Sequence, residues 1–208
     1  MTRRDGHVCT VRSQAFRDGA TETGCAANHE GGRAGKVERT VVHALQAIMG
    51  PVPGRVEAIN ISRGGVPKLP VFEAFIAEHG LGGDHQNDTY HHGGPDRAVV
   101  VYSLDVIRAL QREGHPISAG AVGENLTVSG LEWPAVIPGT RLVVGDVELQ
   151  ITKYATPCRN IRESFVGHDF MRIFQDGHPG WSRVCARVVK GGIVRPGDMV
   201  SVQSVDGV

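Results

Sequence analysis

The strongest candidate for chemistry in this sequence is a cysteine in the segment KYATPCRNI. Cys158 follows an expected strand, Pro157 restricts the backbone before it, and Lys153 and Arg159 bring positive charge close by. Nearby cations favour the thiolate form of a cysteine, which attacks electrophiles and binds soft metals. Most cysteines are buried and inert, but the expected loop and the neighbouring charges favour a functional role for Cys158.

The other three cysteines give no such signal. Cys9 and Cys25 lie in a polar N-terminal stretch, and Cys185 lies inside the apolar run VCARVV, which predicts a buried thiol. The four cysteines form no CxxC pair and have no regular spacing. A disulfide framework or a structural zinc site is therefore not expected.

The densest polar stretch is GLGGDHQNDTYHHGGPDRAV. Its histidines and aspartates lack the HxH or HxxxH spacing of a dedicated metal site. The turn Gly93-Gly94-Pro95-Asp96 exposes backbone N–H groups and, with Arg97 after it, suits an anion such as phosphate. A tight turn capped by Asp96 itself is an equally good interpretation.

Two further residues, Glu124 and Asn125, stand between Gly123 and an expected strand. Asn125 offers amide donors and acceptors to a heterocycle, or it forms an Asx-type bond within a turn. A nucleophilic triad of Cys158, a histidine base and Asp96 as its orienting carboxylate is also conceivable.

Short strands and turns must position these residues. Alternating or β-branched apolar runs predict strands in GRVEAINIS, VFEAFIAEHG, RAVVVYS, NLTVSG, TRLVVGD, VELQITK, SRVCARVVKGG and GDMVSV. The first of these changes phase after Ala58, which predicts a bulge or burial on both faces. Gly145-Asp146 predicts a hairpin turn, and CRNIRESFVGHDFMRIFQDG predicts one or two short helices. The best helix is 103–114, with Ser103 as N-cap and Gly114 at its end. The sequence therefore predicts a mainly β fold with α insertions, a small and partly closed β-barrel.

The first 50 residues differ from the rest. They are polar and Gly-rich, apart from an amphipathic pattern over 37–48 that predicts one helix. We expect a flexible tail at 1–50 and a folded domain at 53–203. An alternative is that translation begins at Met49.

Composition excludes some classes of function. The 208 residues include 22 Lys or Arg and 22 Asp or Glu, so the basic excess typical of nucleic-acid binding is missing. Hydrophobic residues make up 40% and charged residues 21%, an ordinary globular balance. No signal peptide or apolar run of membrane length is visible, so we expect a cytoplasmic protein that binds neither nucleic acid nor membrane.

Four motifs in order resemble the MOSC domain, the module at the C-terminus of molybdenum cofactor sulfurases that also occurs as stand-alone bacterial proteins. They are HHGGPDRAV, GENLTVSGL, a hairpin leading to TPC, and SRVCARVVKGGIVRPGDMV. The opening INISRGGVPKLPV resembles the stand-alone members, and the resemblance covers roughly 53–203.

The resemblance implies a strand-rich barrel that binds a molybdopterin-type cofactor. Cys158 matches the family cysteine, which ligates molybdenum or carries sulfur as a persulfide. Asp96 is expected beside it as a second catalytic residue. The residues expected to bind the cofactor are Lys68, His92, Gly93, Gly94, Arg97, Glu124, Asn125 and Arg183. Of these, Lys68 and Arg183 are proposed partners of the cofactor's phosphate on charge grounds.

Related stand-alone proteins reduce N-hydroxylated bases or amidoximes, which implies a molybdenum-dependent oxidoreductase acting on a small-molecule substrate. The alternatives are a persulfide sulfur carrier or cofactor-handling protein without turnover, and a barrel that has kept the fold without the chemistry. The sequence shows no pyridoxal-phosphate domain and no flavin, haem or iron–sulfur motif. A separate electron-donor or sulfur-donor protein is therefore expected.

Overall fold

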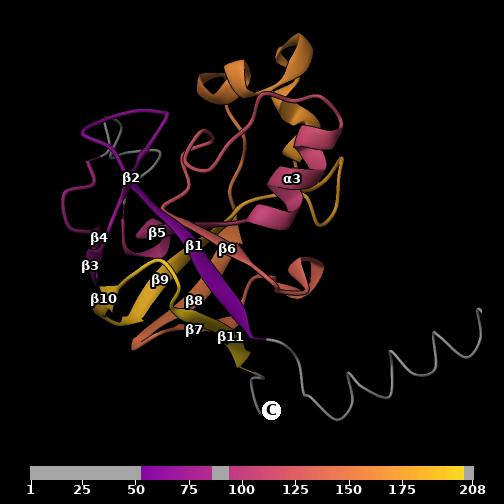
Figure 1. Cartoon of the computed structure of the whole chain (residues 1–208). Coiled ribbons are helices and arrows are strands. Elements are labelled where there is room, and N and C mark those ends of the chain that lie inside the picture. Colours follow the sequence, from indigo (N-terminus) through magenta and orange to yellow (C-terminus); the bar gives the residue numbers. More distant parts are fainter. Residues whose placement is uncertain (1–52, 86–93, 204–208) are drawn as a thin grey trace, which may run out of the picture. The chain divides into compact units, whose positions relative to one another are not determined.

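The described residues of this computed structural model, 53–85 and 94–203, form a β-barrel with a small second sheet (Figure 1). The strand order in the main sheet is β11-β7-β8-β9-β5-β6-β1-β2, and an additional pairing of β1 with β11 closes the barrel and leaves β2 outside it. The barrel strands are β1 (Gly54–Ile61), β5 (Val99–Ser103), β6 (Leu126–Ser129), β7 (Arg141–Val144), β8 (Val147–Tyr154), β9 (Val184–Lys190) and β11 (Met199–Gln203). The predicted barrel is confirmed, and the β1–β11 pairing makes it closed.

The predicted irregularity in the first strand is present as a bulge. The register of β1 against β6 shifts between Val56 and Ala58. Val56 and Ile59 are both buried, although they stand in opposite phases of a strict alternation. The bulge at Glu57 turns both side chains inward, because an extra residue reverses the side-chain phase.

The predicted helix is α3 (Leu104–Arg112), and it connects the parallel strands β5 and β6. The Ser103 hydroxyl caps it by accepting hydrogen bonds from the backbone N–H groups of Asp105 at 3.1 Å and Val106 at 3.3 Å. Ile107 and Leu110 are fully buried against the barrel. The capping and the apolar stripe therefore work as the sequence predicted.

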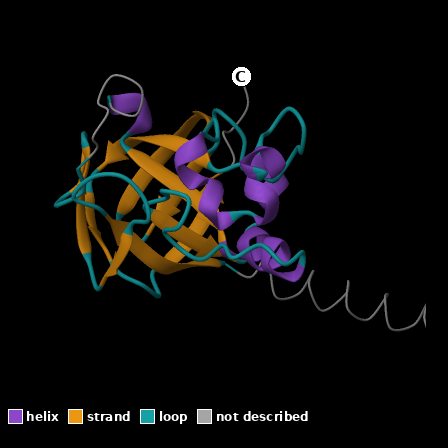
Figure 2. Ribbon diagram, turned by 90° about the horizontal axis from the view of Figure 1, so that it is seen from above, coloured by secondary structure: helices purple, strands orange, loops and turns teal. Residues whose placement is uncertain are grey.

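The predicted hairpin joins β7 to β8, with Val144 opposite Val147 and Gly145 at a positive φ of 55°. Outside the barrel, β2 (Leu69–Val71) pairs with β1. The second sheet has the order β10-β3-β4, from β10 (Gly192–Val194), β3 (Ala74–Ala77) and β4 (Gly80–Leu81). Figure 2 shows the strands wrapped around the core, with most helical turns gathered on one side.

The connection from β8 to β9 differs from the prediction of one or two short helices. It contains three 3-10 helices, at Arg159–Ser164, Val166–His168 and Phe170–Ile173. Gly167 and His168 have φ values of 66° and 58°, which a continuous helix cannot include. The turns are instead anchored by their apolar side chains, since Ile161, Phe165 and Ile173 are buried.

The N-terminal tail and the absence of a membrane span were also predicted. The tail at 1–50, with its helix over 37–48, lies outside the described residues and stays a prediction. Within the described part of the chain, no helix has the length and apolarity needed to cross a membrane.

Candidate functional site

A cavity of about 320 Å³ opens between one end of the barrel and the 3-10 turns. Cys158 lies at its wall, four residues beyond the end of β8, and is partly exposed. The Cys158 carbonyl accepts the Ile161 N–H at 3.2 Å, which starts the first 3-10 turn. The lining residues are Gly65, Val66, Lys68, His85, Arg97, Val100, Val122, Gly123, Lys153, Tyr154, Ala155, Thr156, Cys158, Asn160, Ile161, Arg183 and Cys185.

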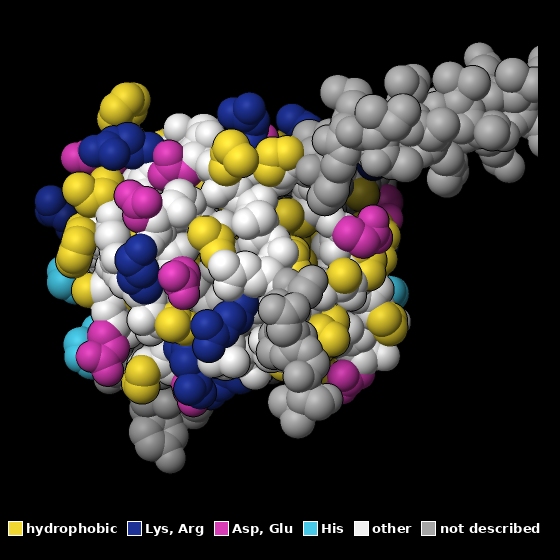
Figure 3. All heavy atoms as spheres, turned by 90° about the horizontal axis from the view of Figure 1, so that it is seen from below, with side chains coloured by type: hydrophobic (Ala, Val, Ile, Leu, Met, Phe, Trp, Pro, Cys, Tyr) yellow, Lys and Arg dark blue, Asp and Glu magenta, His cyan; other side chains and the backbone are white. Residues whose placement is uncertain are grey.

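Positive charge is concentrated in this cavity. Its described lining includes Lys68, Arg97, Lys153 and Arg183 but no Asp or Glu. The chain as a whole has a formal net charge of zero, and the face seen in Figure 3 mixes cationic and anionic side chains. The cavity is therefore suited to an anionic ligand, because clustered cations raise the local concentration of anions.

Lys68 is held in the wall by a buried carboxylate. Asp84 accepts hydrogen bonds from the Lys68 ammonium, from the Ser62 N–H at 2.8 Å and from the Asn125 side-chain amide at 2.8 Å. The side chains of Lys68 and Asp84 are 8% and 5% exposed. Burial lowers the pKa of Lys68, and the hydrogen bond to Asp84 opposes that shift.

Asn125 lies behind the cavity wall and joins three segments. Its side-chain oxygen accepts the Val100 N–H at 3.1 Å, and its amide donates to the Asn60 carbonyl at 3.2 Å as well as to Asp84. Both N–H donors of the amide and one acceptor position of its oxygen are thereby used within the protein. Asn125 thus positions Asp84 through partners distant in sequence rather than through a local Asx-type bond, and its expected contact with a heterocycle stays a prediction.

Glu124 is also behind the wall and is fully buried. Its Oε1 accepts the Gly120 N–H at 2.7 Å and the Thr127 hydroxyl at 3.2 Å, while Oε2 has no hydrogen-bond partner among the described residues. Burial raises the pKa of this carboxyl. Glu124 therefore supports the loop that carries Lys68, because the Gly120 carbonyl accepts the Lys68 N–H at 2.9 Å.

Arg183 brings a buried guanidinium to the cavity. One of its terminal nitrogens donates to the Val122 carbonyl, and its Nε has no partner among the described residues. The backbone before it is fixed by two aromatic side chains. Tyr102 donates its hydroxyl to the Trp181 carbonyl at 2.9 Å, and Trp133 donates its indole N–H to the Ser182 carbonyl at 3.0 Å. An unsatisfied donor on a buried cation points to an anionic partner.

The cavity holds two thiols of different character. Cys185 is buried as the sequence predicted, and burial raises its pKa, opposed by the charges of Arg183 and Lys153. It nevertheless lines the cavity, a placement that its apolar sequence context does not indicate. Cys158 is the more accessible thiol of the two.

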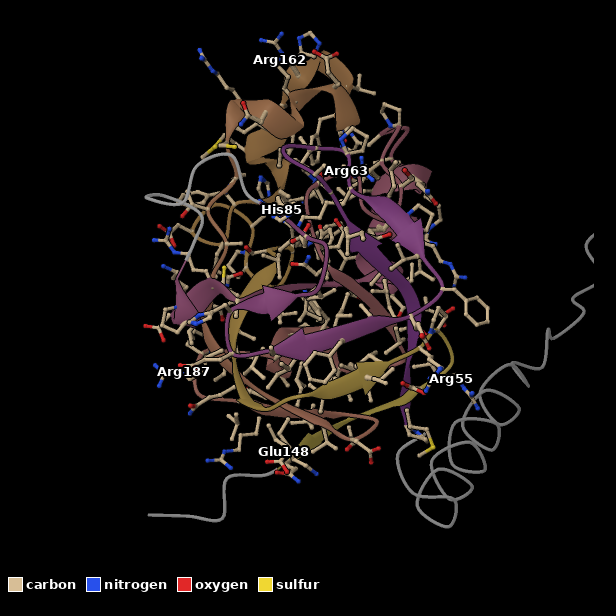
Figure 4. The ribbon with its side chains drawn as sticks, turned by 90° about the vertical axis from the view of Figure 1, so that its left-hand side faces the viewer. Arg55, Arg63, His85, Glu148, Arg162 and Arg187 are labelled. Carbon is tan, nitrogen blue, oxygen red and sulfur yellow. The ribbon has the colours of Figure 1, made fainter. Side chains whose placement is uncertain are left out.

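Of the residues predicted around the glycine-aspartate turn, some line the cavity and others do not. Arg97 lines the cavity, whereas the described cavity lining does not include Asp96 or Gly94. The Asp96 carboxylate is 59% exposed and pairs with Arg187 at 2.8 Å, and Figure 4 shows Arg187 at the outer surface of the barrel. The N-cap of this turn is Gly94, which has no side chain to cap it, and the expected catalytic role of Asp96 stays a prediction.

The remaining predicted site residues are not described, and some cavity residues were not predicted. His92 and Gly93 lie outside the described residues, so their expected roles stay predictions. Sequence reasoning named Lys153 only as a cation near Cys158 and did not select His85, Thr156 or Asn160 for the site, although all four line the cavity. Their closeness in sequence to Asp84 or to Cys158 was the available signal. His85 is fixed by its backbone N–H, which donates to the Ser62 carbonyl at 2.7 Å.

Comparison with known proteins gives the family. The sequence model of the MOSC domain matches residues 88–201, more than half of the chain. The chain belongs to the MOSC domain family. YflK of Bacillus subtilis is 32% identical over 136 residues, which are 64% of this chain and 60% of that protein. YiiM of Escherichia coli is 32% identical over 114 residues, or 52% of this chain and 51% of that protein. This MOSC protein thus spans between half and two thirds of the length of these relatives.

Solved structures support the same fold. YiiM from Geobacillus stearothermophilus superposes with a TM-score of 0.56 at 24% identity, over 73% of this chain and 76% of that one. YiiM from Escherichia coli gives a TM-score of 0.52 at 25% identity, over 73% and 69%. The MOSC-like barrel predicted from the sequence is therefore confirmed.

Proposed function

We propose that this MOSC protein binds a molybdopterin-type cofactor in the cationic cavity, with the Cys158 thiolate as a ligand to molybdenum. The observation that carries the proposal is one partly exposed thiol in the same cavity as four cationic side chains, with no carboxylate in the described lining. Thiolate is a soft ligand suited to such a metal, and cations suit the phosphate of the pterin.

The residues present fit such a group. A cavity of about 320 Å³ falls in the range of small-molecule sites. The Nε of Arg183 is a buried donor without a hydrogen-bond partner among the described residues, and the ammonium of Lys68 is held by Asp84. We assign anion binding to Lys68 and Arg183, with Arg97 and Lys153 adding positive charge. Glu124 and Asn125 support the wall from behind.

For the reaction, we propose reduction of N-hydroxylated small molecules, in which a hydroxylamine or amidoxime N–O bond is broken. Two electrons and two protons enter, and the amine or amidine and one water leave. When bound, the molybdenum group supplies the two-electron oxygen-transfer chemistry. The chain itself orients the substrate, and apolar wall residues such as Val66 and Ile161 limit access of water. A separate electron-donor protein must deliver the electrons.

The test is metal and pterin content after expression in a host that makes the cofactor. We expect near-stoichiometric molybdenum in the parent and little in Cys158→Ser, while Cys185→Ser, which changes the second thiol of the same cavity, retains it. Only loaded protein is then assayed with benzamidoxime and a chemical reductant. Equal molybdenum in the parent and in Cys158→Ser would remove Cys158 as a ligand, and absence of molybdenum and pterin from every variant would overturn the proposal.

The partial exposure of Cys158 favours a second candidate function, because a donor protein can deliver sulfur only to a thiol that it reaches. Cys158 would then carry a persulfide without turnover of its own. Mass spectrometry of the native protein separates the two functions. One added sulfur on the Cys158 peptide, in protein lacking molybdenum, supports the carrier.

A further inference from the structure

The wall of the cavity that carries Cys158 belongs to a segment with few regular hydrogen bonds. Its three 3-10 helices span Arg159–Ser164, Val166–His168 and Phe170–Ile173. Turns of this kind have poorer hydrogen-bond geometry than an α-helix and depend on external contacts. The segment begins directly after Cys158 and the chain then continues to Arg183, so both cavity residues depend on its placement.

One contact joins this segment to the C-terminal end of α3. Arg172 donates from Nε and a terminal nitrogen to the two carboxylate oxygens of Glu113, at 2.9 and 2.7 Å. The side chains of Arg172 and Glu113 are 18% and 39% exposed, so the guanidinium end of the pair is the more buried one. A two-point pair of guanidinium and carboxylate fixes orientation as well as distance, and partial burial reduces its screening by solvent.

The same guanidinium links the pair to the segment that precedes β9 and carries Arg183. Its central carbon lies 3.7 Å from the centroid of the Trp181 ring, a cation–π contact. The Trp181 carbonyl accepts the Tyr102 hydroxyl at 2.9 Å, which fixes the backbone two residues before Arg183. Arg172 therefore contacts the C-cap of α3 on one side and the segment that leads into β9 on the other.

A second contact lies next to the first. His115 accepts the Val166 N–H through Nδ1 at 3.1 Å and packs edge-on against the Phe165 ring, with centroids 5.4 Å apart. The end of α3 thus binds the segment at two points, through Glu113 and through His115. A separate ion pair within the segment, Arg162 with Glu163 at 3.0 Å, joins neighbouring exposed residues only, and Figure 4 shows Arg162 at the segment's outer end.

We infer that Glu113 and Arg172 are positioning residues, which hold the 3-10 segment against α3 and thereby limit access to Cys158. The importance of this pair for function rests on the proposed role of Cys158, whereas its effect on the accessibility of the Cys158 thiol does not. Neither residue lines the cavity. Their effect is therefore on how often the wall opens rather than on what binds inside it.

The experiment measures labelling of Cys158 by a bulky maleimide in folded, metal-free, full-length protein, resolved by peptide mass spectrometry. Global unfolding is measured separately by hydrogen exchange of the β7 peptide Arg141–Val144, because Cys185 lines the same cavity as Cys158. In Glu113→Gln and Arg172→Gln we expect Cys158 labelling to rise roughly three- to tenfold while exchange of the β7 peptide rises much less. Glu163→Gln, which removes the exposed pair of the same segment, should match the parent.

A charge exchange tests whether the pair itself is responsible. In the double variant Glu113→Arg with Arg172→Glu, the ion pair is reversed, so slow labelling should return in part, without the stacking on Trp181. The inference is overturned if Cys158 labelling stays at the parent rate in both single variants, or if exchange of the β7 peptide rises in the same proportion as Cys158 labelling. Labelling needs no cofactor, so absence of molybdenum would overturn the proposed function without affecting this result. Conversely, if the protein binds molybdenum but the variants label at the parent rate, the inference about Glu113 and Arg172 is overturned and the proposed function is not.

Discussion

Asp84 fixes the Lys68 ammonium at the cavity wall, and both side chains are almost completely buried. This pair connects the barrel to the site, because Asp84 also accepts hydrogen bonds from Ser62 and Asn125. Removing one member of a buried ion pair leaves an uncompensated charge, which costs more than a surface pair contributes.

We therefore expect Asp84→Asn to lower the free energy of unfolding by about 3 kcal/mol, a magnitude typical of broken buried pairs. Denaturant unfolding of the apo protein measures this loss. The control is Asp96→Asn, whose carboxylate makes an exposed pair with Arg187 and should change stability by less than about 1 kcal/mol. Similar losses in the two variants would show that the Asp84 pair contributes no more than a surface contact.

Anion binding should weaken at alkaline pH as Lys68 loses its proton. Burial lowers the pKa of Lys68 from 10.5, so its charge is lost at a lower pH than that of an exposed lysine. Calorimetric titration with sulfate, whose own charge is constant between pH 7 and 10.5, should show affinity falling within this window. The fall should be smaller in Lys68→Gln, whose affinity is low throughout, and as large as in the parent in Lys190→Gln, an exposed residue of β9. An identical pH profile in Lys68→Gln would exclude Lys68 as the titrating group.

The sequence predicts the fold well where local signals and burial agree. The Ser103 cap, the apolar positions Ile107 and Leu110, and the Gly145 turn each specify one local structure, and each appears in the fold. The β8–β9 connection was predicted less well, because its conformation depends on distant contacts. Arg172 finds Glu113, 59 residues away, and no local pattern indicates such a pair.

The site was predicted in part for a similar reason. Family motifs locate Cys158 and Arg97, and charge indicates Lys68 and Arg183; all four line the cavity. The same motifs do not separate residues that face the cavity from those behind it, because strand direction and hydrogen-bond partners decide this. Asn125, for example, directly precedes the strand β6, and its side-chain amide donates to the Asn60 carbonyl and to the Asp84 carboxylate.

Glu124 should tolerate loss of its charge better than loss of its shape. Burial raises its pKa above 4.5, so its stabilising contribution is complete below about pH 4.5 and is lost as pH rises through the folded-state pKa. We expect Glu124→Gln to be at least as stable as the parent at pH 8. Glu124→Ala should be about 2 to 4 kcal/mol less stable, because it leaves a cavity and removes the acceptor of the Gly120 N–H. Unfolding curves at pH 5 and pH 8 measure both effects, and a parent that gains stability over Glu124→Gln between these values would contradict the assigned sign.

Gly120 should tolerate no side chain, since it has a φ of +79° and an added Cβ would lie 2.3 Å from the Lys68 carbonyl oxygen. Gly139 is a matched control, with a φ of +96° and no atom within 4 Å of its added Cβ. Gly139→Ala therefore measures the backbone strain alone, about 1 to 2 kcal/mol. Gly120→Ala should lose more stability than this and should also weaken pyrophosphate binding, because the clash displaces the backbone of Lys68. Equal stability losses with unchanged pyrophosphate affinity would show that the loop relaxes without moving Lys68.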